Sequence, residues 1–295
     1  MKAIMDTKLK NAPRGVNPLE GPTLIRYRDA ARFLWGDEKS GQVADIIFGR
    51  NAIISCLIFK LKPGGYFKSS DSWKSYFDQH RFYLVIKGEI AVHDPLTGEV
   101  AVAKAGEAVH WRGAKWHFGY NLSPDECVVL DWYAPQERPP HVTELEFGAT
   151  KPSFAGEKPG RDDLLGQWPD RRLEERQKAE REGGMIVVSR QTALHFVHGE
   201  RYPVLESLLV STEELTAGTV ELIAGARSED REHPGHKIIF VLRGNLHVYL
   251  PEMFEWHELN EWDVLYLPPA TKHQYWNYSG QPTSFAFKVV QQYSG

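Results

Sequence analysis

Short runs of apolar residues recur along two stretches of the chain, from about residue 44 to 133 and from residue 185 almost to the end. In the first stretch they read AIISCLIFKL, RFYLVIKG and CVVLDWYA, and in the second KIIFVLRG, NLHVYL, DVLYLP and SFAFKVV. Short runs rich in Val, Ile, Phe and Tyr, separated by Gly, Pro, Asn and Asp, are typical of strands joined by turns. The pattern therefore predicts two all-β units, each a sandwich or a barrel.

The region between these units is first rich in proline and then highly charged. The segment DRRLEERQKAEREGG predicts a helix, with Pro169 near its start and Gly183 just past its end. Because this helix is charged nearly all round, we expect a solvated connector rather than a core element. The predicted organisation is an N-terminal arm over 1–43, a first barrel over 44–135, a linker with the charged helix over 136–184, and a second barrel over 185–295.

The two halves of the chain repeat each other at a constant offset of 156 residues. This offset carries HRFYLVIKG (80–88) onto HKIIFVLRG (236–244), and His117 and Asn121 onto His273 and Asn277. Such spacing, preserved across a turn, two strands and a loop, predicts an internal duplication.

The second half contains a motif of a known family. DVLYLPPATKHQYWN places Pro268, Ala270, His273 and Asn277 at the spacing of the second cupin motif, G-x5-P-x-G-x2-H-x3-N, with Trp262 in place of its first glycine. The chain resembles a two-domain cupin, or bicupin, over about 110 residues of each half. The resemblance implies two tandem double-stranded β-helix (jelly-roll) barrels of antiparallel strands.

In cupins, two His and one Glu of the first motif and the His of the second motif bind one metal ion inside the barrel. His233 and His273 occupy two of these positions in the second half, whereas Arg231 and Lys237 replace the other His and the Glu. His236 is the candidate for a third ligand, although strand alternation turns it away from Lys237 unless a bulge intervenes. The resemblance thus implies one divalent ion (Fe, Mn, Zn or Ni) in the second barrel, held by His233, His273 and His236.

The first half departs further from the metal motif. It keeps His117, but Ser70 and Ser72 stand where the two His belong and Arg81 stands in the Glu position. We therefore expect no metal ion in the first barrel.

The substituted positions also allow a metal-free interpretation. Lys237 and Arg81 put a cation where the metal would lie, so that charge-assisted hydrogen bonds could hold a carboxylate or phosphate. Alternatively, both side chains reach the barrel mouth or pair with a nearby acid. We assign Lys237 and His273 as candidate catalytic residues. The candidate ligand-binding residues are Arg231, Asn277, Trp276, Arg81 and His117.

Composition narrows the class of protein further. A chain of 295 residues with 42% hydrophobic residues and a net charge of −4 fits two globular domains, and its lack of a basic face argues against nucleic acid as a partner. No apolar run is long enough for a membrane helix, and the first residues lack the apolar segment of a secretory signal. Cys56 and Cys127 lie in apolar runs, as expected for buried thiols. We expect a cytoplasmic homodimer that binds a small molecule.

Three functions remain open at this point. The first is a metal-dependent enzyme, a dioxygenase, decarboxylase or isomerase, acting on a small polar or acidic metabolite in the second barrel. The second is a metal-free cupin that binds a small anion or a sugar acid. The third is a structural or storage protein.

Overall fold

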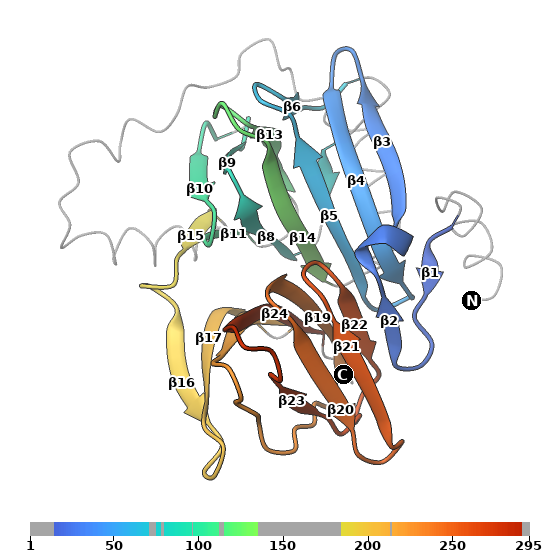
Figure 1. The fold of residues 1–295 in the computed structure, drawn as a ribbon. Coiled ribbons are helices and arrows are strands. Elements are labelled where there is room, and N and C mark those ends of the chain that lie inside the picture. The colour runs from blue at the N-terminus through green and yellow to red at the C-terminus, as the bar shows by residue number, and fades with distance from the viewer. Residues whose placement is uncertain are drawn as a thin grey trace.

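The computed structural model describes residues 15–70, 75–77, 80–95, 97–111, 115–134, 184–212 and 214–290. These residues form strands and one 3-10 turn, η1 (Tyr27–Asp29), so the all-β prediction is confirmed for them. The predicted linker helix lies outside the described residues. Figure 1 shows two β units, the first in blue to green and the second in yellow to red. Within the described residues, no helix has the length and apolar character that a membrane span needs.

The first unit is built on one large sheet of twelve strands among the described residues. In sheet order its main path is β10 (Val100–Lys104), β9 (Glu89–His93), β13 (Phe118–Tyr120), β6 (Tyr66–Phe67), β4 (Gly41–Arg50), β5 (Ser55–Leu61), β14 (Cys127–Ala134), β8 (His80–Lys87), β11 (Ala108–Trp111) and β15 (Ile186–Val188). Strands β1 (Asn17–Pro18) and β3 (Ala31–Asp37) also pair with β4, and β7 (Tyr76–Phe77) pairs with β12 (Lys115–Trp116).

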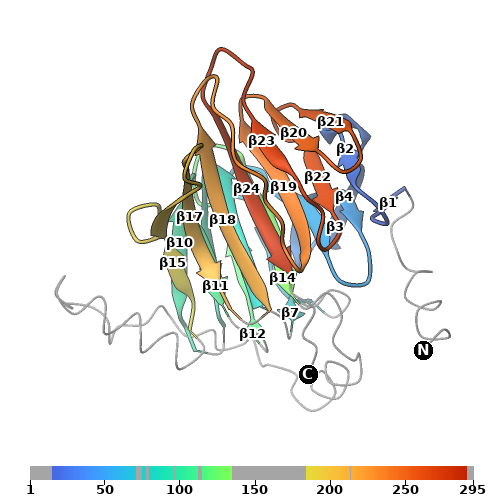
Figure 2. The same cartoon turned by 90° about the horizontal axis from the view of Figure 1, so that it is seen from below.

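The second unit consists of two sheets. The larger sheet runs in the order β16 (Leu194–His198), β17 (Val204–Ser211), β18 (Leu215–Leu222), β24 (Thr283–Val290), β19 (His236–Arg243), β22 (Val264–Leu267) and β2 (Thr23–Ile25). The smaller sheet is β21 (Glu255–Leu259), β20 (Leu246–Leu250) and β23 (Gln274–Trp276). Figure 2 shows β17, β18, β24 and β19 side by side, with strands of the first unit behind them.

Each unit includes one strand that lies outside the residue range predicted for that unit from the sequence. Strand β2 from the predicted N-terminal arm pairs with β22 of the second unit, and Figure 1 shows this blue strand beside the orange one. Strand β15, at the start of the predicted second barrel, pairs instead with β11 of the first unit. The predicted boundary at residue 44 falls inside β4 (Gly41–Arg50), and β4 also pairs with β3, which lies in the predicted N-terminal arm. Pairing across the chain therefore ties the two units together.

Three apolar cores hold this arrangement. One fills the first barrel, around Tyr83 and Trp111, and one fills the second, around Tyr275 and Phe285. The third lies between the barrels and includes Phe48. Successive side chains along the strands of each large sheet therefore point alternately into a barrel and into the core between the barrels, because the side-chain period of a strand is two.

The repeat seen in the sequence has a structural counterpart in equivalent turn glycines and equivalent asparagine hydrogen bonds to the backbone. Gly88 and Gly244 follow the equivalent strands β8 and β19 at φ of 75° and 82°, where a Cβ would meet a backbone oxygen at 2.7 Å and 2.9 Å respectively. A residue other than glycine would be strained at both turns. Asn121 and Asn277 each donate from Nδ2 to three backbone carbonyls, two at the end of a distant strand and one four residues further along the chain. The family-typical Gly and Asn are therefore structural.

Candidate functional site

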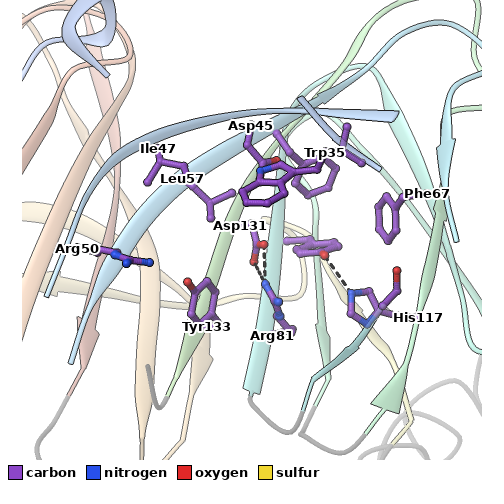
Figure 3. A pocket seen from close by; sticks show the side chains of 14 residues that line it. Trp35, Asp45, Ile47, Arg50, Leu57, Phe67, Arg81, His117, Asp131 and Tyr133 are labelled. Atoms are coloured by element: carbon purple, nitrogen blue, oxygen red, sulfur yellow. Dashed lines mark hydrogen bonds and ion pairs between the residues drawn. The ribbon is translucent and has the colours of Figure 1, made fainter. Parts of the chain in front are cut away.

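The first barrel encloses a cavity of about 290 Å³, shown in Figure 3. Its walls are mostly apolar and aromatic, and a few polar side chains converge on them, which is the usual composition of a small-molecule site. The lining residues are Trp35, Val43, Asp45, Ile47, Arg50, Leu57, Phe59, Phe67, Ser75, Arg81, Tyr83, His117, Asp131 and Tyr133.

Strand alternation explains why the polar groups face the cavity. Asp45 lies on β4 and Asp131 on β14, and both strands pair with β5 between them. In register, Asp45 is opposite Phe59 and Asp131 is opposite Leu57, two residues further along the same face of β5. Side chains two apart share a face, so two carboxyl groups far apart in the sequence meet on one wall.

An ion pair crosses the middle of the cavity. Arg81 Nη1 donates to both oxygens of Asp131, at 2.7 Å and 2.6 Å, and the guanidinium lies 4.6 Å from the ring centre of Tyr133. Both charged side chains are buried. Burial opposes the charge of Arg81, but the Asp131 carboxylate raises its pKa. Burial also raises the pKa of Asp131, and Arg81 opposes this shift. Burial thus opposes both charges, and the two hydrogen bonds between them offset part of that cost.

Asp45 is a second carboxyl group on the same wall. Burial and the neighbouring Asp131 carboxylate raise the pKa of Asp45 from 3.8 to about 8, while Arg81 and Trp35 oppose the shift. Two like charges close together in an apolar site cannot both ionise easily. At neutral pH, Asp45 therefore holds a proton that it can donate.

His117 closes the far end of the cavity. Its Nε2 lies 3.2 Å from Tyr83 Oη, and its ring packs against Phe67 and Trp111 at 5.9 Å and 4.9 Å between ring centres. Burial and Asp131 raise the pKa of Tyr83, so its hydroxyl stays protonated. The predictions of Arg81 and His117 as ligand-binding residues thus fall on this cavity (Figure 3).

The second barrel contains a different polar cluster, centred on Lys237. Its Nζ donates to Tyr275 Oη at 2.5 Å and lies 3.2 Å from His273 Nε2. His273 Nδ1 lies 2.8 Å from the carbonyl oxygen of Thr271, which can only accept, so Nδ1 carries the proton and Nε2 accepts from Lys237. Burial and nearby Arg231 lower the pKa of Lys237. Burial and Lys237 lower the pKa of His273 in turn.

Two further predicted residues lie beside this cluster. The ring centres of His233 and His273 are 6.1 Å apart, and burial followed by the charge of Lys237 lowers the pKa of His233 to about 3. His233 Nε2 is buried and has no hydrogen-bond partner within the described part of the chain. Arg231 forms a buried ion pair with Glu206 and is bridged to the backbone of His273. Arg231 is therefore already neutralised by a protein carboxylate.

The remaining predicted residues do not join the cluster. His236 lies on the opposite face of β19 from Lys237, with Nδ1 2.6 Å from Tyr266 Oη in the region between the barrels, as strand alternation without a bulge requires. Trp276 points outward from β23 and stacks on Tyr278 at 5.2 Å between ring centres. Asn277 holds the backbone, as described above. The structure thus brings two of the three predicted imidazoles together, His233 and His273, but not His236.

These donor sets do not fit a bound metal ion. A site with an open position for chemistry needs at least three N or O ligands from the protein. In the second barrel, His233 and His273 are the two imidazoles, and the Lys237 amine lies against the ring nitrogen that would face the metal. No group of three His, Cys, Asp or Glu side chains suited to a metal exists among the described residues. The Mn, Fe, Zn or Ni ion implied by the family pattern thus lacks a third ligand within the described part of the chain.

Comparison with known proteins defines the class. Residues 218–289 match the family model described as Cupin domain. The chain as a whole has the two-barrel fold of bicupins, which confirms the resemblance stated from the sequence.

Two solved structures illustrate the likeness of fold. AerE from Microcystis aeruginosa has a TM-score of 0.58 at 10% identity, covering 89% of this chain and 98% of its own. A variant of the oxalate decarboxylase OxdC from Bacillus subtilis has a TM-score of 0.62 at 13% identity, covering 96% of this chain and 81% of its own. Another structure of OxdC, at 14% identity and a TM-score of 0.60, is described by its Mn(II) centres. No curated protein matches the chain by sequence.

Several cavity residues were missed by sequence reasoning. Asp45, Asp131 and Tyr83 belong to strands whose apolar runs predicted only β structure. An available signal was an acidic residue inside each of the runs ADIIF and CVVLDWYA, because a carboxylate within an otherwise apolar strand requires a buried partner.

Proposed function

We propose that this bicupin binds a small organic molecule in the first-barrel cavity and catalyses a proton transfer on it without a metal ion. The observation that carries the proposal is the pair of carboxyl groups, Asp45 and Asp131, on one wall of an otherwise apolar cavity. Pairs of acids with different protonation states in one site are the usual arrangement for acid–base chemistry.

The roles follow from the geometry. Arg81 donates two hydrogen bonds to the Asp131 carboxylate and opposes the rise in its pKa, and burial together with Asp131 raises the pKa of Asp45 to about 8. A proton donor is most effective when its pKa lies near the working pH. Asp45 is therefore the proposed proton donor, Asp131 and Arg81 position it electrostatically, and the Tyr83–His117 pair offers hydrogen bonds to the other end of the ligand. Isomerisation and decarboxylation both end with such a proton delivery to carbon.

The volume of the cavity limits the ligand. About 290 Å³ lies at the lower end of the roughly 300–1,000 Å³ that small-molecule sites occupy, so a metabolite of one ring or a short chain fits and a dinucleotide does not. The proposal thus moves the site from the second barrel to the first and keeps the metal-free interpretation.

Binding is tested with a fragment panel that contains acids, amines and neutral rings. We expect at least one fragment to raise the melting temperature of the full chain in the presence of EDTA. Leu57→Trp should fill the cavity and abolish the shift, whereas Leu34→Trp, on an exposed side chain, should leave it unchanged. A panel without hits, or hits that survive Leu57→Trp in a folded protein, would contradict the location of the site.

Catalysis is tested with the fragments that bind. In deuterated water, the protein should exchange a carbon-bound hydrogen of the ligand, and Asp45→Asn should slow this exchange by about 10²–10⁴-fold, the usual contribution of a general acid. Asp29→Asn, at an exposed carboxylate outside the cavity, is the matched control. Equal exchange by the Asp45→Asn and Asp29→Asn variants would remove Asp45 from the reaction.

A further inference from the structure

An irregularity in β4 brings Arg50 to the cavity. From Ala44 to Ile47, β4 pairs with β5 in one register, and the register shifts by one residue between Ile47 and Gly49. Without the shift, Arg50 would point to the same side as Phe48, into the core between the barrels. With it, Arg50 lies opposite Ser55, on the side of Ile47 and Leu57, and lines the cavity. Bulges of this kind re-aim side chains next to functional sites.

Arg50 has no hydrogen bond or ion pair from its side chain to any described residue. Its register partner Ser55 is 1% exposed, and Ser55 Oγ has no hydrogen-bond partner in the described part of the chain either. Ser55 is not among the residues that line the cavity, so the donor that faces a ligand is the Arg50 guanidinium.

The charges of the lining residues also indicate an anionic ligand. Arg81 and Asp131 neutralise each other, and Asp45 is uncharged at neutral pH because its pKa is about 8. This leaves the guanidinium of Arg50 as the charge without a counterion among the described lining residues. One positive charge is matched by one negative charge on a ligand.

We propose that the ligand of the first barrel is a small monocarboxylate with a flat apolar body, and that Arg50 binds its carboxylate. This inference rests on the proposed function of the cavity and names its substrate class. The planar fork of a guanidinium matches a carboxylate with two parallel hydrogen bonds.

The remaining walls define the rest of the ligand. In Figure 3, Arg50 lies at one end of the cavity and His117 at the other, with the Arg81–Asp131 pair between them. Ile47, Leu57 and Tyr133 line the part next to Arg50, so the atoms beyond the carboxylate meet apolar and aromatic surfaces. The reacting part of the ligand then lies within the central region, where Asp45 can reach it.

The test compares three probes of one shape but different charge. Phenylacetate, phenylacetamide and phenethylamine are titrated calorimetrically into the full chain at pH 7 with EDTA present. We expect phenylacetate to bind at least tenfold more tightly than the amide and the amine. Arg50→Met should weaken phenylacetate binding at least tenfold and leave amide binding unchanged, and Arg50→Lys should recover part of the loss. Arg28→Met, at an exposed arginine outside the cavity, is the control.

The outcomes separate this inference from the proposed function. If the amide or the amine binds as tightly as phenylacetate, or if folded Arg50→Met keeps full affinity for phenylacetate, the carboxylate assignment is overturned while the cavity still binds a ligand. If no fragment of any charge binds, the proposed function itself fails. A circular dichroism spectrum and melting temperature of each ligand-free variant establish that it is folded.

Discussion

Replacement of Asp45 by Asn tests how the raised pKa of one buried carboxyl group contributes to the pH dependence of stability. The pKa of Asp45 is about 8 in the folded protein and near 3.8 when exposed, so between these values the folded state keeps a proton that the unfolded chain has lost. Stability contributed by this proton is complete below pH 3.8 and is lost as the pH rises through about 8. Each pH unit inside this window costs about 1.4 kcal/mol.

The stability of the variant relative to the wild type should therefore increase as the pH rises. Asn has nearly the shape of protonated Asp but no charge to desolvate, so Asp45→Asn removes the titration. We expect the difference in unfolding free energy between the variant and the wild type to increase by about 2.7 kcal/mol from pH 5 to pH 7 and to level off above pH 8.

Urea unfolding followed by tryptophan fluorescence at pH 5, 6, 7 and 8 measures this difference. Other titrating groups, such as the imidazoles with lowered pKa in the second barrel, change both proteins alike and largely cancel. Parallel stability curves for the two proteins would refute the reasoning, because they would show that Asp45 titrates in the folded protein as it does in water.

Three further outcomes follow from the same contacts. Lys237→Glu should place a carboxylate beside the two imidazoles of the second barrel. Because three ligands then replace two, the variant should bind Zn²⁺ at least tenfold more tightly than the wild type in calorimetry. Unchanged affinity would contradict the interpretation of Lys237 as the group that opposes a metal. Asp131→Asn should cost about 3–5 kcal/mol in urea unfolding because Arg81 stays buried without its partner, and combining Asp131→Leu with Arg81→Met should recover much of this loss. Burial lowers the pKa of Lys288 from 10.5 to about 7, so Lys288 should add about 2 kcal/mol to wild-type stability between pH 7 and pH 9, partly offset by the titration of Asp45. The Lys288→Met variant should lack this contribution, and an equal pH dependence in both proteins would contradict it.

The sequence by itself determined the local features of this protein. Short apolar runs separated by turn residues predicted the strands, the constant offset predicted two related barrels, and the turn glycines Gly88 and Gly244 marked equivalent corners. Alternation alone also put His236 and Lys237 on opposite faces of one strand, which the structure confirms. These features depend on residues close together in the chain, so periodicity and spacing are enough to predict them.

Only the tertiary structure decided that the first barrel holds a cavity and which groups meet in it. Asp45 and Asp131 share a wall because β5 pairs with both of their strands, and Arg50 joins them because one register shift reverses the direction of its side chain. Strands β2 and β15 likewise pair across the predicted boundaries. Long-range register and desolvation depend on partners distant in sequence, and a run of residues contains no record of either.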